Sequence, residues 1–171
     1  LRGREALVEM RMRRAEVSAQ LWPRALRYGR AIAALPFVRM VALTGSLTMG
    51  NVQPDDDFDY LIVTEPGRLW LARALVIGLV VRPAARRDDE VCPNYLLSER
   101  ALVFEEQNLY TAHELAQMIP LSGVRLYQRM RCLNPWTARF LPNAEGPPRT
   151  VDVQKQRGRP AYSLVEAILR T

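Results

Sequence analysis

Apolar residues recur at helical spacing through the first part of the chain. Between residues 5 and 34, Leu7, Met10 and Val17 fall mostly at that spacing among many arginines, which predicts amphipathic helix. Pro23 interrupts this range. Because proline lacks a backbone N–H and fits best in the first turn of a helix, we expect Pro23 to start a second helix or to kink the first.

Three short apolar runs then have the length of β-strands. Residues 37–43 lie between a proline and Gly45, residues 58–63 follow an acidic turn, and residues 91–97 follow a charged loop. Between the second and third runs, residues 68–82 have the length and apolar content of a buried helix. This order predicts a small mixed sheet flanked by helices, an α/β fold of the α+β type.

The residues after the third strand predict helices. Thr111 and Glu114 have the spacing of a capping box, in which each residue's side chain satisfies the other's free backbone donor. We expect this box to open a helix that ends near Pro120, followed by two more short helices before Pro142.

These elements divide the chain into three segments. We expect residues 1–107 to form the core with its N-terminal helices, and residues 108–142 to form a helical extension packed on that core. Residues 143–160 are rich in glycine, proline and charge, which is typical of a linker. Residues 161–170 predict an amphipathic helix, so residues 143–171 would be a linker and a terminal helix.

Composition narrows the class of protein. With 171 residues and 49% hydrophobic content, the chain can bury one sizeable core. The net charge of +6 would attract nucleic-acid phosphates, but all basic residues except Lys155 are arginine, which favours a compositional bias over a binding patch. Cys92, Cys132 and the single histidine, His113, have no metal-ligand spacing, so the sequence gives no basis for a zinc site.

The composition also predicts a cytoplasmic protein without a membrane partner. The two thiols suit a reducing compartment. The first thirty residues carry many arginines and lack the layout of a signal peptide. The longest uncharged apolar run, residues 74–81, is too short to cross a bilayer.

The candidate chemistry lies around the first two predicted strands. Gly45 and Ser46 close the first strand, where free backbone N–H groups and a hydroxyl can hold phosphate oxygens. Asp57 and Asp59 are two residues apart at the start of the second strand, so both carboxylates project to one side. Neighbouring carboxylates repel each other unless a cation lies between them, and Mg²⁺ prefers such oxygen ligands.

This segment resembles the nucleotidyltransferase signature of the DNA polymerase β superfamily, a Gly-Ser pair followed after about ten residues by Asp-x-Asp. It looks closest to the minimal and aminoglycoside-type nucleotidyltransferases, whose pattern Gly50, Pro54 and Asp55 also match. The resemblance covers residues 38–63. It implies a polymerase β-like fold in which Gly45 and Ser46 hold a nucleoside triphosphate and the paired acids bind the metal. An acceptor hydroxyl then attacks the α-phosphorus, and pyrophosphate leaves.

Two departures from this pattern lie close to the expected phosphates. The minimal enzymes often carry arginines one and three residues after the serine, where this chain has Leu47 and Met49. The serine that commonly precedes the first metal-binding acid is Asp56 here, which adds a negative charge.

A third departure concerns the acid that family members usually place on the next strand. By strand order this position falls within residues 92–97, and Asn94 is the best-placed residue. An asparagine can offer an oxygen to a metal but cannot accept a proton as a base. Glu99, at the far end of that strand, is the nearest substitute, and Asp88 and Asp89 on the preceding loop are weaker candidates.

The leading hypothesis is therefore Mg²⁺-dependent transfer of a nucleoside monophosphate from a triphosphate to an acceptor hydroxyl. Gly45 and Ser46 would hold the phosphates, Asp57 and Asp59 the metal, with Asn94 or Glu99 completing the site. The acceptor can be a small molecule, a protein or an RNA end, and these residues do not choose among them or fix the oligomeric state. Two alternatives are an inactive triphosphate-binding regulatory module on the same fold, and a helical interaction module in which these motifs are incidental.

Overall fold

The computed structural model describes residues 4–149, which are organised around one mixed sheet. The sheet has four strands in the order β3-β2-β1-β4. Its strands are β1 (Val38–Leu43), β2 (Phe58–Thr64), β3 (Val91–Ser98) and β4 (Ile119–Ser122). β1 runs antiparallel to β2 and β4, and β2 runs parallel to β3. The predicted α+β class and the three predicted strands are confirmed.

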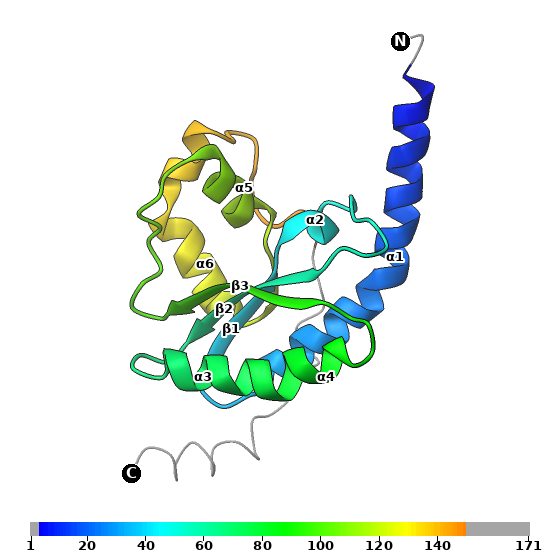
Figure 1. The fold of residues 1–171 in the computed structure, drawn as a ribbon. Helices are drawn as coiled ribbons and strands as arrows, with labels where there is room; N and C mark the ends of the chain where they lie inside the picture. Colours follow the sequence, from blue (N-terminus) through cyan, green and yellow to red (C-terminus); the bar gives the residue numbers. More distant parts are fainter. Residues whose placement is uncertain (1–3, 150–171) are drawn as a thin grey trace.

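Helices cover both faces of this sheet (Figure 1). One face packs against α1 (Glu5–Ala33) and against a helix that runs through α3 (Leu69–Val76), the π-helical turn η1 (Ile77–Val81) and α4 (Arg82–Ala85). The other face packs against α5 (Leu109–Gln117), α6 (Val124–Leu133) and the 3₁₀ helix η2 (Pro135–Arg139). The one-turn helix α2 (Gly45–Thr48) follows β1 directly.

The strands alternate between two hydrophobic cores because successive side chains of a strand point to opposite faces. Val41 and Leu43 of β1 belong to the core beneath α1, whereas Met40 and Ala42 belong to the core beneath α5 and α6. The same alternation runs along β2 and places its odd-numbered residues on the α5 side. Asp59 therefore points toward α5.

The long helix α1 contains Pro23. The helix continues through Pro23 as one element, which excludes the first of the two expected alternatives, a second helix start, and leaves the kink untested. The residues of α1 that are buried all lie from Ser18 onward. The N-terminal half projects beyond the sheet (Figure 1) and exposes apolar side chains such as Met12.

The C-terminal part of the described chain contains two further corrections. The capping box lies one turn earlier than expected: Asn108 is the N-cap, and its partner is Thr111. This leaves Glu114 free of a capping role. The helix ends at Gln117 and is followed by β4, a strand that the sequence pattern did not reveal. Pro120 is tolerated there because β4 is an edge strand.

β4 ties part of the expected helical extension into the sheet. The two short helices expected next are confirmed as α6 and η2. Residues 143–149 form neither helix nor strand, while the rest of the expected linker and the terminal helix at residues 161–170 lie outside the described residues. Within residues 4–149, no helix has both the length and the apolar character that crossing a bilayer requires.

Candidate functional site

Pairing of β1 with β2 brings the Gly-Ser turn against the acidic pair. The backbone N–H of Thr44 donates to the carbonyl oxygen of Asp59 over 2.9 Å. Gly45 has a φ of +70°, and a Cβ at this position would lie 2.2 Å from Oδ2 of Asp59. Both observations require glycine. The carboxylate of Asp59 thus packs directly against the backbone of Gly45.

Three potential metal ligands converge at this point. Asp57 lies just before β2, Asp59 lies in it, and Cys92 is the residue of β3 that pairs with Asp59. One ligand atom from each of the three lies within 4.8 Å of the other two, and all three residues are half-buried. Two carboxylate oxygens fit Mg²⁺ or Mn²⁺, and the thiol adds a softer donor. This donor set is compatible with a divalent cation.

The electrostatics of the cluster also favour a cation. Burial, followed by the charges of Asp57 and Glu114, raises the pKa of Asp59 to about 6. Burial, followed by the charges of Asp59 and Asp57, raises the pKa of the Cys92 thiol to about 12. Both shifts come first from burial and then from the neighbouring negative charges, which make ionisation of either group less favourable. A bound cation would relieve that repulsion and lower both pKa values.

The sheet register shows which residue of β3 lies opposite Asp59. The sheet register pairs Asp59 with Cys92 and is irregular before the Leu61–Tyr95 pair. Cys92, two residues before Asn94, is therefore the residue of β3 opposite Asp59. Asn94 is exposed, and its amide nitrogen donates to Oε2 of Glu114 over 3.3 Å.

Glu99 lies at the wrong end of β3 to serve the site. It follows Ser98, and its backbone N–H donates to the carbonyl oxygen of Thr64 over 2.9 Å. At roughly 3.3 Å per residue, it is roughly 23 Å along the strand from Cys92. The parallel pairing of β2 and β3 keeps that separation fixed.

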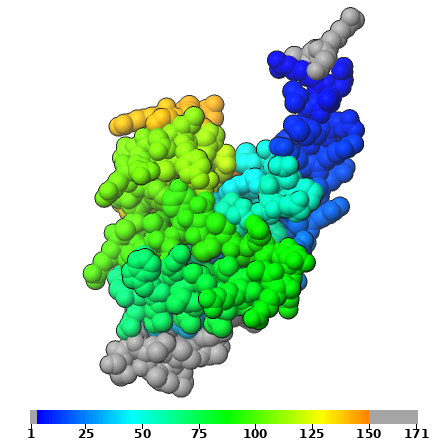
Figure 2. Space-filling view, in the orientation of Figure 1, coloured from blue at the N-terminus to red at the C-terminus, as the bar shows by residue number. Residues whose placement is uncertain are grey.

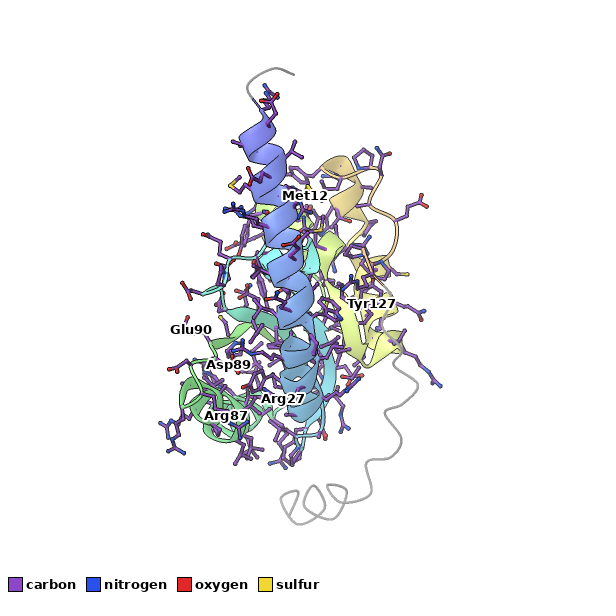
Figure 3. All side chains as sticks on the ribbon, turned by 90° about the vertical axis from the view of Figure 1, so that its right-hand side faces the viewer. Met12, Arg27, Arg87, Asp89, Glu90 and Tyr127 are labelled. Atoms are coloured by element: carbon purple, nitrogen blue, oxygen red, sulfur yellow. The ribbon has the colours of Figure 1, made fainter. Side chains whose placement is uncertain are left out.

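Asp89 has a structural role. Its carboxylate is buried, accepts a hydrogen bond from the Tyr28 hydroxyl over 2.5 Å and forms ion pairs with Arg24 and, over 3.9 Å, with Arg27. Figure 3 shows Asp89 beside α1, close to Arg27. These contacts join the loop before β3 to α1. The neighbouring Asp88 is exposed.

Glu114 is the carboxylate that the sequence interpretation missed. It comes from α5, is buried, and interacts electrostatically with Asp59. Burial raises the pKa of Glu114, and the nearby Thr44 hydroxyl lowers it by a smaller amount. One signal was available: Glu114 stands beside Leu115 and Ala116 in a helix whose other buried residues are uncharged. A carboxylate kept at such a position indicates a polar function for that face.

A groove opens beside these residues. It has a volume of about 440 Å³ and is lined by Arg11, Gly45, Ser46, Met49, Asn51, Glu114 and Gln117. In Figure 2 the cyan segment that carries α2 lies between the blue α1 and the green surface of the remaining chain. The groove therefore joins residues from α1, α2 and α5, which are far apart in the sequence.

The added acid Asp56 helps to shape the loop between α2 and β2. Its Oδ2 accepts hydrogen bonds from the Ser46 hydroxyl over 3.2 Å and from the backbone N–H of Gln53 over 2.9 Å. Asp56 is also the weakest of the contributors that raise the pKa of Asp59. Its main effect is thus on loop conformation.

Comparison of the chain with protein-family profiles and with curated proteins gives no match. A solved structure described as a crystal structure of a toxin–antitoxin with AMP-PNP is similar to 84% of this chain and 98% of its own chain. The sequence identity is 13% and the TM-score is 0.39. A likeness at that level carries no conclusion about function, so the assignment of fold class depends on the sheet order and the two helical layers described above.

Proposed function

We propose that the chain is a nucleotidyltransferase of the polymerase β type, which moves a nucleoside monophosphate from a triphosphate to an acceptor hydroxyl. The observation that carries the proposal is the contact between Gly45 and Asp59, with Asp57 and Cys92 alongside and an open groove next to them. Phosphoryl-type transfer needs positioning and charge neutralisation more than covalent participation by the protein. This arrangement offers both, in a protein that we expect to be cytoplasmic.

Asp57 and Asp59 would hold the metal, and Gly45 and Ser46 would contact the phosphates. A divalent cation such as Mg²⁺, when bound, neutralises phosphate oxygens and orients the leaving group. The resemblance of residues 38–63 to the superfamily signature supports the same roles.

Glu114 replaces Asn94 and Glu99 in the proposal as the residue that activates the acceptor. The acceptor hydroxyl oxygen forms a bond to the α-phosphorus, the bond from that phosphorus to the pyrophosphate oxygen breaks, and the hydroxyl proton passes to the Glu114 carboxylate. Glu114 lines the groove, and its burial makes it a stronger base than an exposed glutamate. Asn94, which donates to Glu114, would orient that carboxylate.

A pyrophosphate-release assay tests the proposal. The wild-type chain is incubated with ATP, GTP, CTP or UTP, with Mg²⁺ or Mn²⁺, and with small hydroxylated molecules, proteins or RNA as acceptors. We expect release with at least one combination and its loss in Asp57→Asn. Asp55→Asn, which removes an exposed carboxylate two residues away, is the matched control and should retain activity. Equal activity of Asp57→Asn and wild type would contradict the proposal.

Cys92 favours a second candidate, a triphosphate-binding regulatory module without turnover. A thiol with a raised pKa is a poorer ligand for Mg²⁺ than the acid usually found there. Triphosphate binding measured by calorimetry, without pyrophosphate release, would support this candidate. Cys92→Asp restores an acid at this position, and in the enzyme it should raise the Mg²⁺-dependent rate several-fold. An unchanged rate would show that Cys92 lies outside the reacting centre.

A further inference from the structure

The N-terminal half of α1 contacts the turn that follows α2. The Arg11 guanidinium donates through Nη2 to the carbonyl oxygen of Met49 over 2.7 Å, and through Nη1 to that of Gly50. One helical turn later, Nη1 of Arg14 donates to Oδ1 of Asn51 over 3.3 Å. Two arginines from a distant part of the chain therefore fix the turn between the Gly-Ser pair and the acidic loop.

Arg11 is also the positively charged side chain that lines the groove. Among the residues that line it, Arg11 carries positive charge and Glu114 carries negative charge, while the others are uncharged. Asp57 and Asp59 add further negative charge nearby. A polyphosphate in this groove would lie near these carboxylates, and a cationic side chain of the protein would offset their repulsion.

The guanidinium of Arg11 is well placed to supply that contact. Its two hydrogen bonds to carbonyl oxygens hold the planar group in one orientation, which reduces the entropy lost when a ligand binds. A guanidinium has more N–H donors than these two bonds use, and its charge is permanent. Arginine pairs with phosphate oxygens through short, charge-assisted hydrogen bonds.

We infer that Arg11 binds the β- and γ-phosphates of the triphosphate and so replaces the positive charge that Leu47 and Met49 do not provide. The inference depends on the proposed function, because it concerns the same groove. Leu47 is buried, so it cannot reach a ligand, and Met49 lines the groove without charge. Arg11 reaches the groove from α1, across the backbone of the turn that carries Met49.

Calorimetric titration of the full chain with ATP, ADP and AMP, each with Mg²⁺, tests the inference. Arg11→Gln removes the charge but keeps a side-chain donor for the carbonyl oxygens of the turn. Arg13→Gln is the matched control, because Arg13 is exposed on the same helix and pairs with Glu9 over 3.2 Å, away from the groove. Melting temperatures confirm that both variants are folded.

We expect Arg11→Gln to weaken ATP binding about tenfold, ADP binding less, and AMP binding hardly at all. Arg11→Lys should recover part of the loss, and Arg13→Gln should match the wild type. If Arg11→Gln weakens ATP, ADP and AMP equally, Arg11 acts only on the turn and the inference is overturned. If the wild type binds ATP and Arg11→Gln binds it equally well, the inference alone fails. If the wild type binds no triphosphate, the inference and the proposed function both fail.

Discussion

Replacing Asp59 by asparagine should stabilise the metal-free protein at neutral and alkaline pH. Burial and the neighbouring charges of Asp57 and Glu114 raise the pKa of Asp59 from 3.8 to about 6. The ionised carboxylate therefore destabilises the folded state. Asparagine has nearly the same shape and no charge. The substitution removes the repulsion without opening a cavity.

The magnitude follows from the pKa shift. A shift from 3.8 to about 6 is about 2 pKa units, and at 1.36 kcal/mol per unit this sets an upper bound of about 3 kcal/mol. Asp59 is half-buried, so solvent screening reduces the effect to about 1 kcal/mol. For a domain of this size, that corresponds to a rise in melting temperature of about 2–4 °C.

The pH dependence has a definite sign. Because the pKa of Asp59 is higher in the folded than in the unfolded state, the folded state of the wild type is most stable at low pH, where the group is protonated in both states. That contribution is lost as pH rises from about 4 through about 6. The advantage of Asp59→Asn should therefore appear above about pH 6 and vanish below about pH 4.

Calorimetric melting with a chelator, at about pH 8 and about pH 4, measures this difference, with Asp55→Asn as the control for loss of an exposed carboxylate. Added Mg²⁺ or Mn²⁺ should stabilise the wild type and leave Asp59→Asn unchanged, because a cation that binds the folded state alone raises its stability. The reasoning is refuted if Asp59→Asn melts below the wild type at both pH values, or if metal stabilises both proteins equally.

Two further pairs of variants test close packing and buried hydrogen bonding. Gly45→Ala and Gly67→Ala both place alanine at positive φ, which costs about 1 kcal/mol of stability. Of the two, only the Cβ at position 45 would meet a carboxylate oxygen. Urea denaturation should show a loss larger by about 1–3 kcal/mol for Gly45→Ala, and equal losses would argue against the close contact. Tyr28→Phe should cost about 1.5–3 kcal/mol because it removes a hydrogen bond to buried Asp89. Tyr127→Phe should be neutral, since its buried hydroxyl has no hydrogen-bond partner among the described residues, and a similar loss in both variants would contradict these assignments.

The sheet and its acidic pair could be predicted because their signals are local. Apolar runs of strand length identify β1, β2 and β3, and residues two apart in a strand share a face whatever surrounds them. The Gly-Ser pair that marks the turn at Gly45 is also a local signal. Its positive φ and its contact with Asp59 both leave glycine as the only fitting residue.

The rest of the site depends on contacts that sequence spacing does not encode. The pairing of Cys92 with Asp59 is a property of the β2–β3 register, and strand order alone placed the third position within residues 92–97, where Asn94 was chosen. Glu114 was assigned to a capping box because Thr111 stands three residues before it, but Asn108 forms the box with Thr111. Arg11 reaches the groove from a helix segment that lies more than thirty residues before the turn.

β4 escaped prediction for a different reason. It is four residues long and contains Pro120, and both features argue against a strand in the middle of a sheet. At an edge they are harmless, but edge position is a property of the whole sheet. Tertiary packing on α1 and pairing with β1 supply what local propensity lacks.

The central claim is that the paired carboxylates and the Gly-Ser turn serve one bound metal–triphosphate complex. Its most direct test is a crystal structure of the chain with Mn²⁺ and a non-hydrolysable triphosphate, in which anomalous scattering locates the metal. We expect the Mn²⁺ peak within roughly 2–2.6 Å of an oxygen of both Asp57 and Asp59, with the phosphates against Gly45 and Ser46. A metal or a triphosphate bound elsewhere, with this groove filled by solvent, would contradict the account.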